Sequence, residues 1–134
     1  MKMLAIVTYL ATQGCGLPCA SGLLANFVTE VGPGLDPCTI SHSGIGLPQW
    51  AGHRKRRMMA TLGHRWCQID AQLGFVFTEL REMGLLDRLL RATDPAEAAR
   101  IFMHGFERPR SRDPRHRMAK ARSIYRELQT GVAR

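Results

Sequence analysis

Apolar side chains recur at helical spacing along most of this chain. Near the start, Leu4, Val7 and Leu10 or Ala11 predict a first amphipathic helix. After a predicted turn over residues 14–18, a second helix opens at Cys19-Ala20 or Ser21 and ends at Gly32-Pro33-Gly34. Its apolar positions are Leu23, Leu24, Phe27, Val28 and Val31.

The segment from Gly32 to Gly52 breaks this pattern. Gly, Pro, Ser or Asp occupies almost every other position, and only Ile40 and Ile45-Gly46-Leu47 are compatible with short strands. We therefore expect an irregular loop or a small β-hairpin. Loops of this length inside a compact domain are usually functional.

The second half of the chain is predicted to be helical from Arg54 onward. One segment carries Met58, Met59 and Leu62, a longer one runs from Trp66 to Leu80 and ends at Gly84, and residues 85–90 form a short successor. Asp94-Pro95-Ala96-Glu97 and Asp113-Pro114 are helix starts, and the last helix has a stripe of Met118, Ala121, Tyr125 and Leu128. We predict one mostly α domain over residues 1–134, without internal repeats.

Composition narrows the class of protein. No run of 18 apolar residues is present, so no membrane span is expected. Residues 1–11 are similar to a short signal peptide, but polar residues interrupt them and no small-x-small cleavage site follows, so we expect this helix to remain in the mature protein. A net charge of +8 indicates a polyanionic partner: nucleic acid, an acidic membrane face or a bacterial cell wall.

The chain has four cysteines, Cys15, Cys19, Cys38 and Cys67, which allow three disulfide pairings and favour an oxidising destination. With His42 and His64 they could also hold zinc. The spacing argues against zinc, because Cys15 and Cys19 flank a Gly and a Pro and no second close pair exists. We expect buried or bonded cysteines, no metal site and no cofactor.

Glu30 is the candidate catalytic residue. It falls in the last turn of the second predicted helix, where the helix dipole disfavours a carboxylate, and it follows large apolar side chains. Both effects favour a protonated acid, which glycoside cleavage needs as a proton donor. Asn26 lies one turn earlier on the same face, where it could bind Glu30 or a sugar.

Several motifs resemble the phage tail lysozyme family, from about Leu4 to about Leu128. They are the stretch 22–32, which contains Glu30, then Asp36-Pro37, 44–50 with Arg54, 72–76 with Glu79-Leu80, and Phe106-Glu107-Arg108-Pro109. The order of Glu, loop and Gly-Leu-x-Gln is also similar to goose-type lysozymes and lytic transglycosylases. Many relatives have Ser where this chain has Val31.

The resemblance implies a lysozyme-like fold and a muramidase that cleaves the link between N-acetylmuramic acid and N-acetylglucosamine, with Glu30 as general acid. Gln49 and Trp50 would contact the sugar, the latter by stacking, unless Trp50 is a core anchor. The resemblance also implies a protein that is virion-associated or exported to the periplasm or cell wall. Such a protein could belong to a phage tail or a secretion assembly. Whether the product is hydrolytic or that of a lytic transglycosylase stays open.

A second catalytic group is harder to identify. Asp36 is the only other acid between Glu30 and Asp70, although a residue before Pro is typical of a turn. His42 is a candidate base, and Thr39, Ser41, His42 and Ser43 could position a water. Glu79 and Glu107 are interpreted as partners of Lys and Arg residues, since both are remote in sequence from Glu30.

Two other functions remain open. The basic run 54–57 and the stretch 108–126 would suit a nucleic-acid-binding module, but few aromatic residues accompany them and no nucleic-acid-binding motif is present. A wall-binding domain without activity would keep affinity for peptidoglycan and release no product. We therefore expect peptidoglycan, and not nucleic acid, as the partner.

Overall fold

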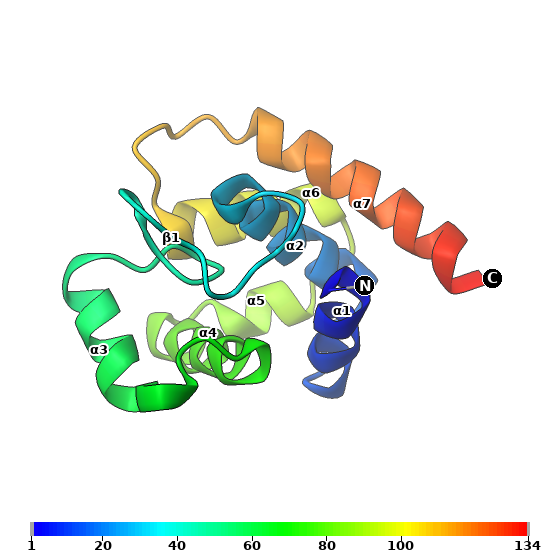
Figure 1. The fold of residues 1–134 in the computed structure, drawn as a ribbon. Helices are drawn as coiled ribbons and strands as arrows, with labels where there is room; N and C mark the ends of the chain where they lie inside the picture. Colours follow the sequence, from blue (N-terminus) through cyan, green and yellow to red (C-terminus); the bar gives the residue numbers. More distant parts are fainter. Residues whose placement is uncertain (1, 134) are drawn as a thin grey trace.

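The computed structural model describes residues 2–133, and it confirms the mostly α fold class. Its elements, in chain order, are α1 (Lys2–Thr12), α2 (Leu17–Val31), β1 (Ile40–Ser41), β2 (Gly44–Ile45), α3 (Gly52–Leu62), the 3-10 turn η1 (Gly63–Arg65), α4 (Ile69–Met83), α5 (Leu86–Leu90), α6 (Pro95–Phe102), the π-helical turn η2 (Met103–Glu107) and α7 (Arg115–Ala133) (Figure 1).

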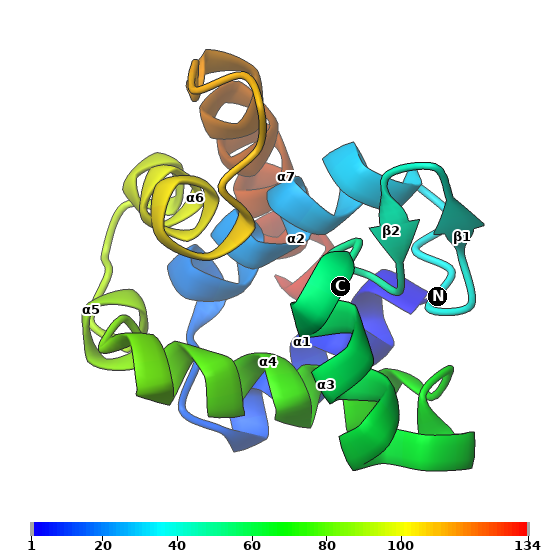
Figure 2. The same ribbon diagram turned by 90° about the vertical axis from the view of Figure 1, so that its left-hand side faces the viewer.

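Helix α2 is the centre of the fold. It packs against α6 and α7 and, less extensively, against α1 (Figures 1 and 2). Gly22 makes the contact with α6 possible, because a Cβ at this position would lie 2.6 Å from the Ala98 Cβ. Further along, Phe27 meets Phe102 edge to face at 5.7 Å, and Phe102 stacks on Phe106 at 4.5 Å. This close packing fixes η2 relative to the end of α2.

Most predicted helix ends are confirmed. Helix α2 stops before Gly32, α4 stops before Gly84 in the left-handed conformation, and Asp94 caps α6 by accepting a hydrogen bond from the Ala96 N–H. Two starts are wrong. Helix α2 begins at Leu17, because Pro18 belongs to its first turn and not to a preceding turn. The helix predicted from Trp66 begins at Ile69, because Trp66 ends the 3-10 turn η1.

Two predicted helix faces are rotated. In α1 the buried residues are Ile6 and Leu10, whereas Leu4 is 51% exposed. In α7 the buried positions are Arg117, Ala121, Ile124 and Leu128, so the face includes an arginine that the predicted stripe left out. Both stripes have helical spacing. Packing against α2 and α4 selects the buried face of α1, and packing against α2 and α6 selects that of α7.

The segment between α2 and α3 forms a small hairpin. Strands β1 and β2 pair antiparallel, with Ile40 opposite Ile45, and Ile45 also pairs with Trp50. Gly44 is required here, since a Cβ would lie 2.4 Å from the Gln49 carbonyl oxygen. The buried Gln72 side chain of α4 holds the segment from below: it accepts from the Leu47 N–H at 3.0 Å and donates to the Pro37 carbonyl oxygen at 2.8 Å.

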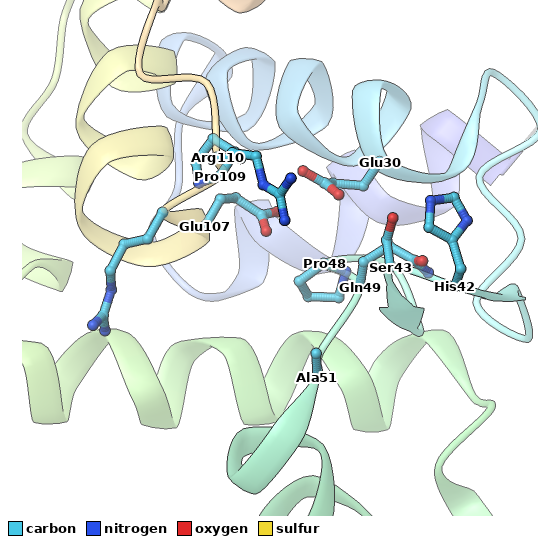
Figure 3. A pocket seen from close by; sticks show the side chains of 10 residues that line it. Glu30, His42, Ser43, Pro48, Gln49, Ala51, Glu107, Pro109 and Arg110 are labelled. Carbon is cyan, nitrogen blue, oxygen red and sulfur yellow. The ribbon is translucent and has the colours of Figure 1, made fainter.

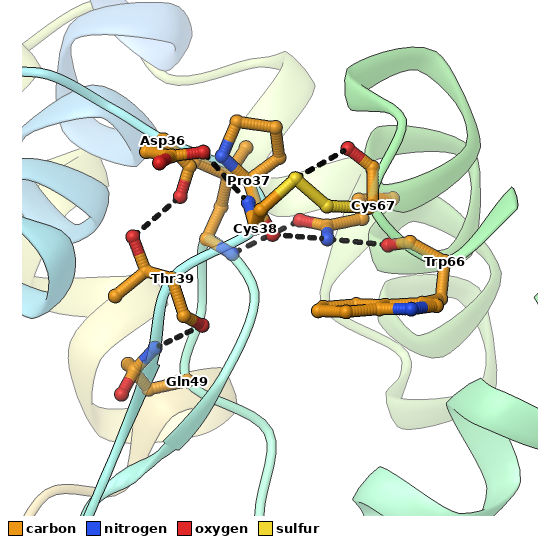
Figure 4. The surroundings of a disulfide bond; sticks show 9 residues. Asp36, Pro37, Cys38, Thr39, Gln49, Trp66 and Cys67 are labelled. Carbon is orange, nitrogen blue, oxygen red and sulfur yellow. Dashed lines mark hydrogen bonds between the residues drawn. A yellow bond between two sulfur atoms is a disulfide. The ribbon is translucent and has the colours of Figure 1, made fainter.

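A disulfide joins Cys38, before the hairpin, to Cys67, before α4 (Figure 4). Cys15 and Cys19 are free thiols buried in the core. The zinc interpretation therefore loses two of its four sulfur ligands to the disulfide. Within residues 2–133, no three His, Cys, Asp or Glu side chains are arranged to hold a metal ion. None of the described helices is long and apolar enough to cross a bilayer.

Reduction of the disulfide is expected to destabilise the protein. Cys38 and Cys67 are 29 residues apart, and closing a loop of that size stabilises a fold by about 2–4 kcal/mol. Thermal unfolding with and without reductant measures the effect. The double variant Cys38→Ser/Cys67→Ser is the control: it should start at the lower stability and show no response to reductant. A wild-type protein that ignores reductant would contradict the expected contribution.

Candidate active site

A cleft of about 520 Å³ lies between the end of α2, the hairpin and the segment after η2 (Figure 3). Ten residues line it: Glu30, His42, Ser43, Pro48, Gln49, Ala51, Glu107, Arg108, Pro109 and Arg110. Glu30, His42, Ser43 and Gln49 were predicted site residues, and the structure brings these four together. The other lining residues were not predicted, and Glu107 had been interpreted as a structural partner of Lys or Arg because it is remote in sequence from Glu30.

Glu30 is held at the cleft by an arginine from the other end of the chain. Arg117 of α7 donates from Nη2 to Glu30 Oε2 at 2.8 Å and from Nη1 to Asn26 Oδ1 at 2.7 Å. The side chains of Arg117 and Glu30 are only 9% and 16% exposed. The sequence predicted apolar surroundings for Glu30. The structure differs, because a buried guanidinium contacts the Glu30 carboxylate.

Asn26 supports this pair from the core. It is completely buried, and its amide donates to the carbonyl oxygens of Gly22 and Ala99. Of the two predicted partners of Asn26, Glu30 or a sugar, this burial favours the side of Glu30. The remaining acceptor oxygen of Asn26 fixes Arg117, which in turn orients Glu30. Asn26 is therefore a positioning residue.

Asp36 does not line the cleft. Its carboxylate accepts a hydrogen bond from the Cys38 N–H at 2.9 Å, and its carbonyl oxygen accepts from the Thr39 hydroxyl (Figure 4). This is the geometry of a turn-forming aspartate. This geometry favours the turn-forming alternative for Asp36, and of the two candidates only His42 is among the residues that line the cleft.

The hairpin presents two polar residues, His42 and Ser43, to the cleft. In Figure 3 the Ser43 hydroxyl points into the cleft on the side of Glu30. Two other hydroxyls that could have positioned a water are already engaged: Thr39 bonds Asp36, and Ser41 donates to Gln49 Oε1 at 2.6 Å. Among the four predicted water-positioning residues, His42 and Ser43 therefore keep side chains that face the cleft.

Gln49 lines the cleft, but its side-chain amide forms hydrogen bonds within the hairpin. In addition to accepting from Ser41, it donates from Nε2 to the Gly46 carbonyl oxygen at 2.9 Å, and its side chain is largely buried. The predicted hydrogen bond to an N-acetyl group is not what this geometry favours. Gln49 instead shapes the wall that carries His42 and Ser43.

Trp50 is a core residue, which favours the core-anchor alternative over stacking on a sugar. It is 2% exposed, meets Phe75 edge to face at 5.7 Å and donates from Nε1 to Glu79 Oε1 at 2.7 Å. Glu79 also forms an ion pair with Arg54 at 3.0 Å, which confirms the interpretation of Glu79 as a structural partner.

Arg54 connects this network to the far side of the cleft. Its Nη1 donates to the Phe106 carbonyl oxygen at 2.8 Å, and its guanidinium lies 4.5 Å from the centroid of the Phe106 ring. Trp50 and Arg54 belong to one motif of the sequence, and Glu79 and Phe106 belong to two others. They meet beneath the cleft and fix the hairpin end, α4 and η2 in one arrangement.

Glu107 is the site residue that sequence reasoning misjudged. It follows Phe106 at the end of η2, and in Figure 3 its carboxyl group points toward the side of the cleft where Glu30 lies. Its Oε2 atom is buried and has no hydrogen-bond partner among the described residues. Burial raises the pKa of Glu107 well above its usual range. The nearby charge of Glu30 raises it further, while Arg117 and Arg54 act in the opposite direction.

Arg117 is the residue that sequence reasoning missed. A signal was present: positions 117, 121, 124 and 128 share one helix face, and an arginine on an otherwise apolar face needs a buried partner. Arg54 and Arg117, both counted among the basic runs that would suit nucleic acid, point into the protein instead. This weakens the nucleic-acid-binding interpretation.

Comparison with known proteins agrees with the predicted resemblance. The sequence profile of the phage tail lysozyme family matches residues 1–128 of the 134-residue chain. No curated protein matches this chain. The matched range includes α2 with Glu30, the hairpin, η2 with Glu107 and most of α7 with Arg117. The chain therefore belongs to the phage tail lysozyme family.

Proposed function

We propose that this protein is a muramidase that hydrolyses the link between N-acetylmuramic acid and N-acetylglucosamine in peptidoglycan, with Glu30 as general acid. The observation that carries the proposal is the position of Glu30 at the cleft, with Oε2 bonded to Arg117. Among the described residues, no hydrogen bond engages Oε1. This second oxygen can carry a proton to the glycosidic oxygen while Arg117 keeps the carboxyl group in place.

The rest of the reaction uses the hairpin side of the cleft. When the glycosidic C–O bond breaks, the leaving oxygen keeps the proton from Glu30. Glu30, now a carboxylate, accepts a proton from a water that attacks the sugar. His42 and Ser43 face the cleft and are placed to orient this water. Attack by the sugar's own 6-hydroxyl instead of water would give the product of a lytic transglycosylase.

The surface charge and the family support an anionic wall polymer as substrate and a virion-associated enzyme. Peptidoglycan carries peptide carboxylates, and a chain with a net charge of +8 is attracted to such a polymer. Arg108 and Arg110 place positive charge at the cleft itself. We propose that the enzyme acts as part of a phage tail assembly, with export to the periplasm or cell wall as the alternative.

Digestion of purified peptidoglycan, with the released muropeptides identified by mass spectrometry, tests the proposal. We expect muropeptides with a reducing N-acetylmuramic acid end. Products lighter by one water would carry an anhydro end and would identify a lytic transglycosylase. If the protein sediments with peptidoglycan but releases no sugar fragment, it is a wall-binding domain, and the enzymatic proposal fails.

A further inference from the structure

Glu107 and Glu30 form a pair of carboxyl groups across the cleft. Both line the same cavity, and in Figure 3 the carboxyl group of each points toward the space between η2 and α2. Each residue is anchored by a separate structural element. Arg117 holds Glu30, and Arg54 holds the carbonyl oxygen of Phe106, the residue before Glu107. The pair is therefore built into the fold.

The charged and titratable groups around Glu107 come from every element that surrounds the cleft. They are Glu30 of α2, His42 of the hairpin, Arg54 of α3, Glu79 of α4, Arg117 of α7, and Arg108 and Arg110 of the segment after η2. Two of the arginines are already bonded to other acids: Arg54 to Glu79 and Arg117 to Glu30. Neither guanidinium donates a hydrogen bond to Glu107.

This arrangement decides where a proton is held. An ionised Glu107 would place a second negative charge beside Glu30 and would leave a buried oxygen, Oε2, without a donor. A protonated Glu107 avoids both costs, whereas Glu30 already has a hydrogen-bond donor in Arg117. Two interacting carboxyl groups of this kind keep one proton between them over a range of pH, and they titrate as a pair.

We propose that Glu107 is a positioning residue for the muramidase reaction, and that it shares one proton with Glu30 so that the pair remains singly protonated at neutral pH. This inference rests on the proposed function. In the free enzyme the proton lies mainly on Glu107. For each bond cleaved, the O–H bond of Glu107 breaks, its proton crosses the cleft through a water that binds both carboxyl groups, and an O–H bond forms on Glu30. That proton then passes to the glycosidic oxygen, and the attacking water returns one proton to the pair.

The first test does not depend on activity. An unfolded chain releases the Glu107 proton at the usual pH of a glutamate carboxyl, whereas the folded chain keeps it. The contribution of Glu107 to the free energy of unfolding of the wild type therefore falls as pH rises above that value, until Glu107 ionises in the fold as well. Glu107→Gln has no proton to keep, so its curve should lack this fall and lie above the wild-type curve at neutral pH.

Chemical denaturation from acid to neutral pH measures these curves. Glu127→Gln, which removes an exposed carboxylate of α7, is the matched control and should follow the wild type. Parallel curves for the wild type and Glu107→Gln would show that Glu107 is ionised at neutral pH, and this result would overturn the proposal.

The second test is the pH profile of kcat on peptidoglycan. In Glu107→Gln only Glu30 can hold the proton, so the basic limb should move to lower pH by about one unit or more, with KM unchanged. Glu107→Asp keeps a carboxyl group and should restore part of the shift. A purely structural role would lower kcat at every pH and leave the limb in place, which would also overturn the proposal.

The two tests distinguish failure of the proposed muramidase activity from failure of the proposed role of Glu107. If the wild type releases no sugar, the proposed muramidase fails and the catalytic part of this inference fails with it. The stability curves still decide whether Glu107 holds the proton. Circular dichroism of each variant confirms that it is folded before either measurement is made.

Discussion

Replacement of Glu30 by glutamine is expected to lower the rate of peptidoglycan cleavage by a factor of about 10²–10⁴, the contribution of a well-placed general acid. The amide cannot donate a proton to the glycosidic oxygen as a carboxylic acid does. Its carbonyl oxygen can still accept the hydrogen bond from Arg117, which the wild-type Oε2 accepts at 2.8 Å. The variant should therefore fold and bind the substrate, and the loss should appear in kcat.

Release of soluble muropeptides at saturating peptidoglycan measures this effect. Glu127→Gln removes one exposed negative charge far from the cleft-lining residues and is expected to retain wild-type activity. This control accounts for the change in net charge, which by itself alters attraction to the wall. Full activity in folded Glu30→Gln would exclude Glu30 as the general acid and would direct attention to Glu107.

Replacement of Arg117 by methionine is expected to lower the free energy of unfolding by about 2–4 kcal/mol. Methionine fills much of the same volume but removes both hydrogen bonds of the guanidinium. Asn26 is completely buried, so its Oδ1 atom would be left without a donor. Glu30 would lose its only arginine contact among the described ion pairs. Activity should fall as well, since the orientation of Glu30 depends on that contact.

Denaturant unfolding of the variant gives the free energy directly. Arg122→Met is the matched control, because Arg122 is exposed on the same helix and its loss should leave stability unchanged. If Arg117→Met proved as stable as the control, the buried Asn26–Arg117–Glu30 network would not contribute to the fold. Arg117→Lys is a useful intermediate, since a lysine cannot bond two acceptors with the planar geometry of arginine.

Local features of this chain were predictable because their causes are local. The glycines after α2 and α4 end those helices through their own backbone conformation. Asp94 starts α6 because its side chain accepts a hydrogen bond from the first turn of that helix. The same holds for the position of Glu30 in the last turn of α2 and for the turn-forming role of Asp36. Hydrophobic spacing alone was enough for the mostly α fold class.

The site needed more than local rules. Trp50 and Gln49 have side chains that suit sugar binding, and only burial shows that one belongs to the core and the other to the hairpin. The disulfide pairing was likewise open, since four cysteines allow three pairings. The contact of Gln72 with the Pro37 carbonyl oxygen helps to bring Cys38 close to Cys67. These assignments depend on contacts between segments that are distant in the chain.

The sequence by itself determined the helices, the family and the candidate acid Glu30. Only the tertiary structure decided how that acid is controlled. Arg117 follows Glu30 by 87 residues and Glu107 lies in another motif, yet the packing of α6 and α7 on α2 brings Arg117 against Glu30 and Glu107 to the cleft that Glu30 lines. The physical reason is that burial and nearby charges decide whether a carboxyl group holds a proton. Both are set by neighbours in space, which spacing along the chain does not reveal.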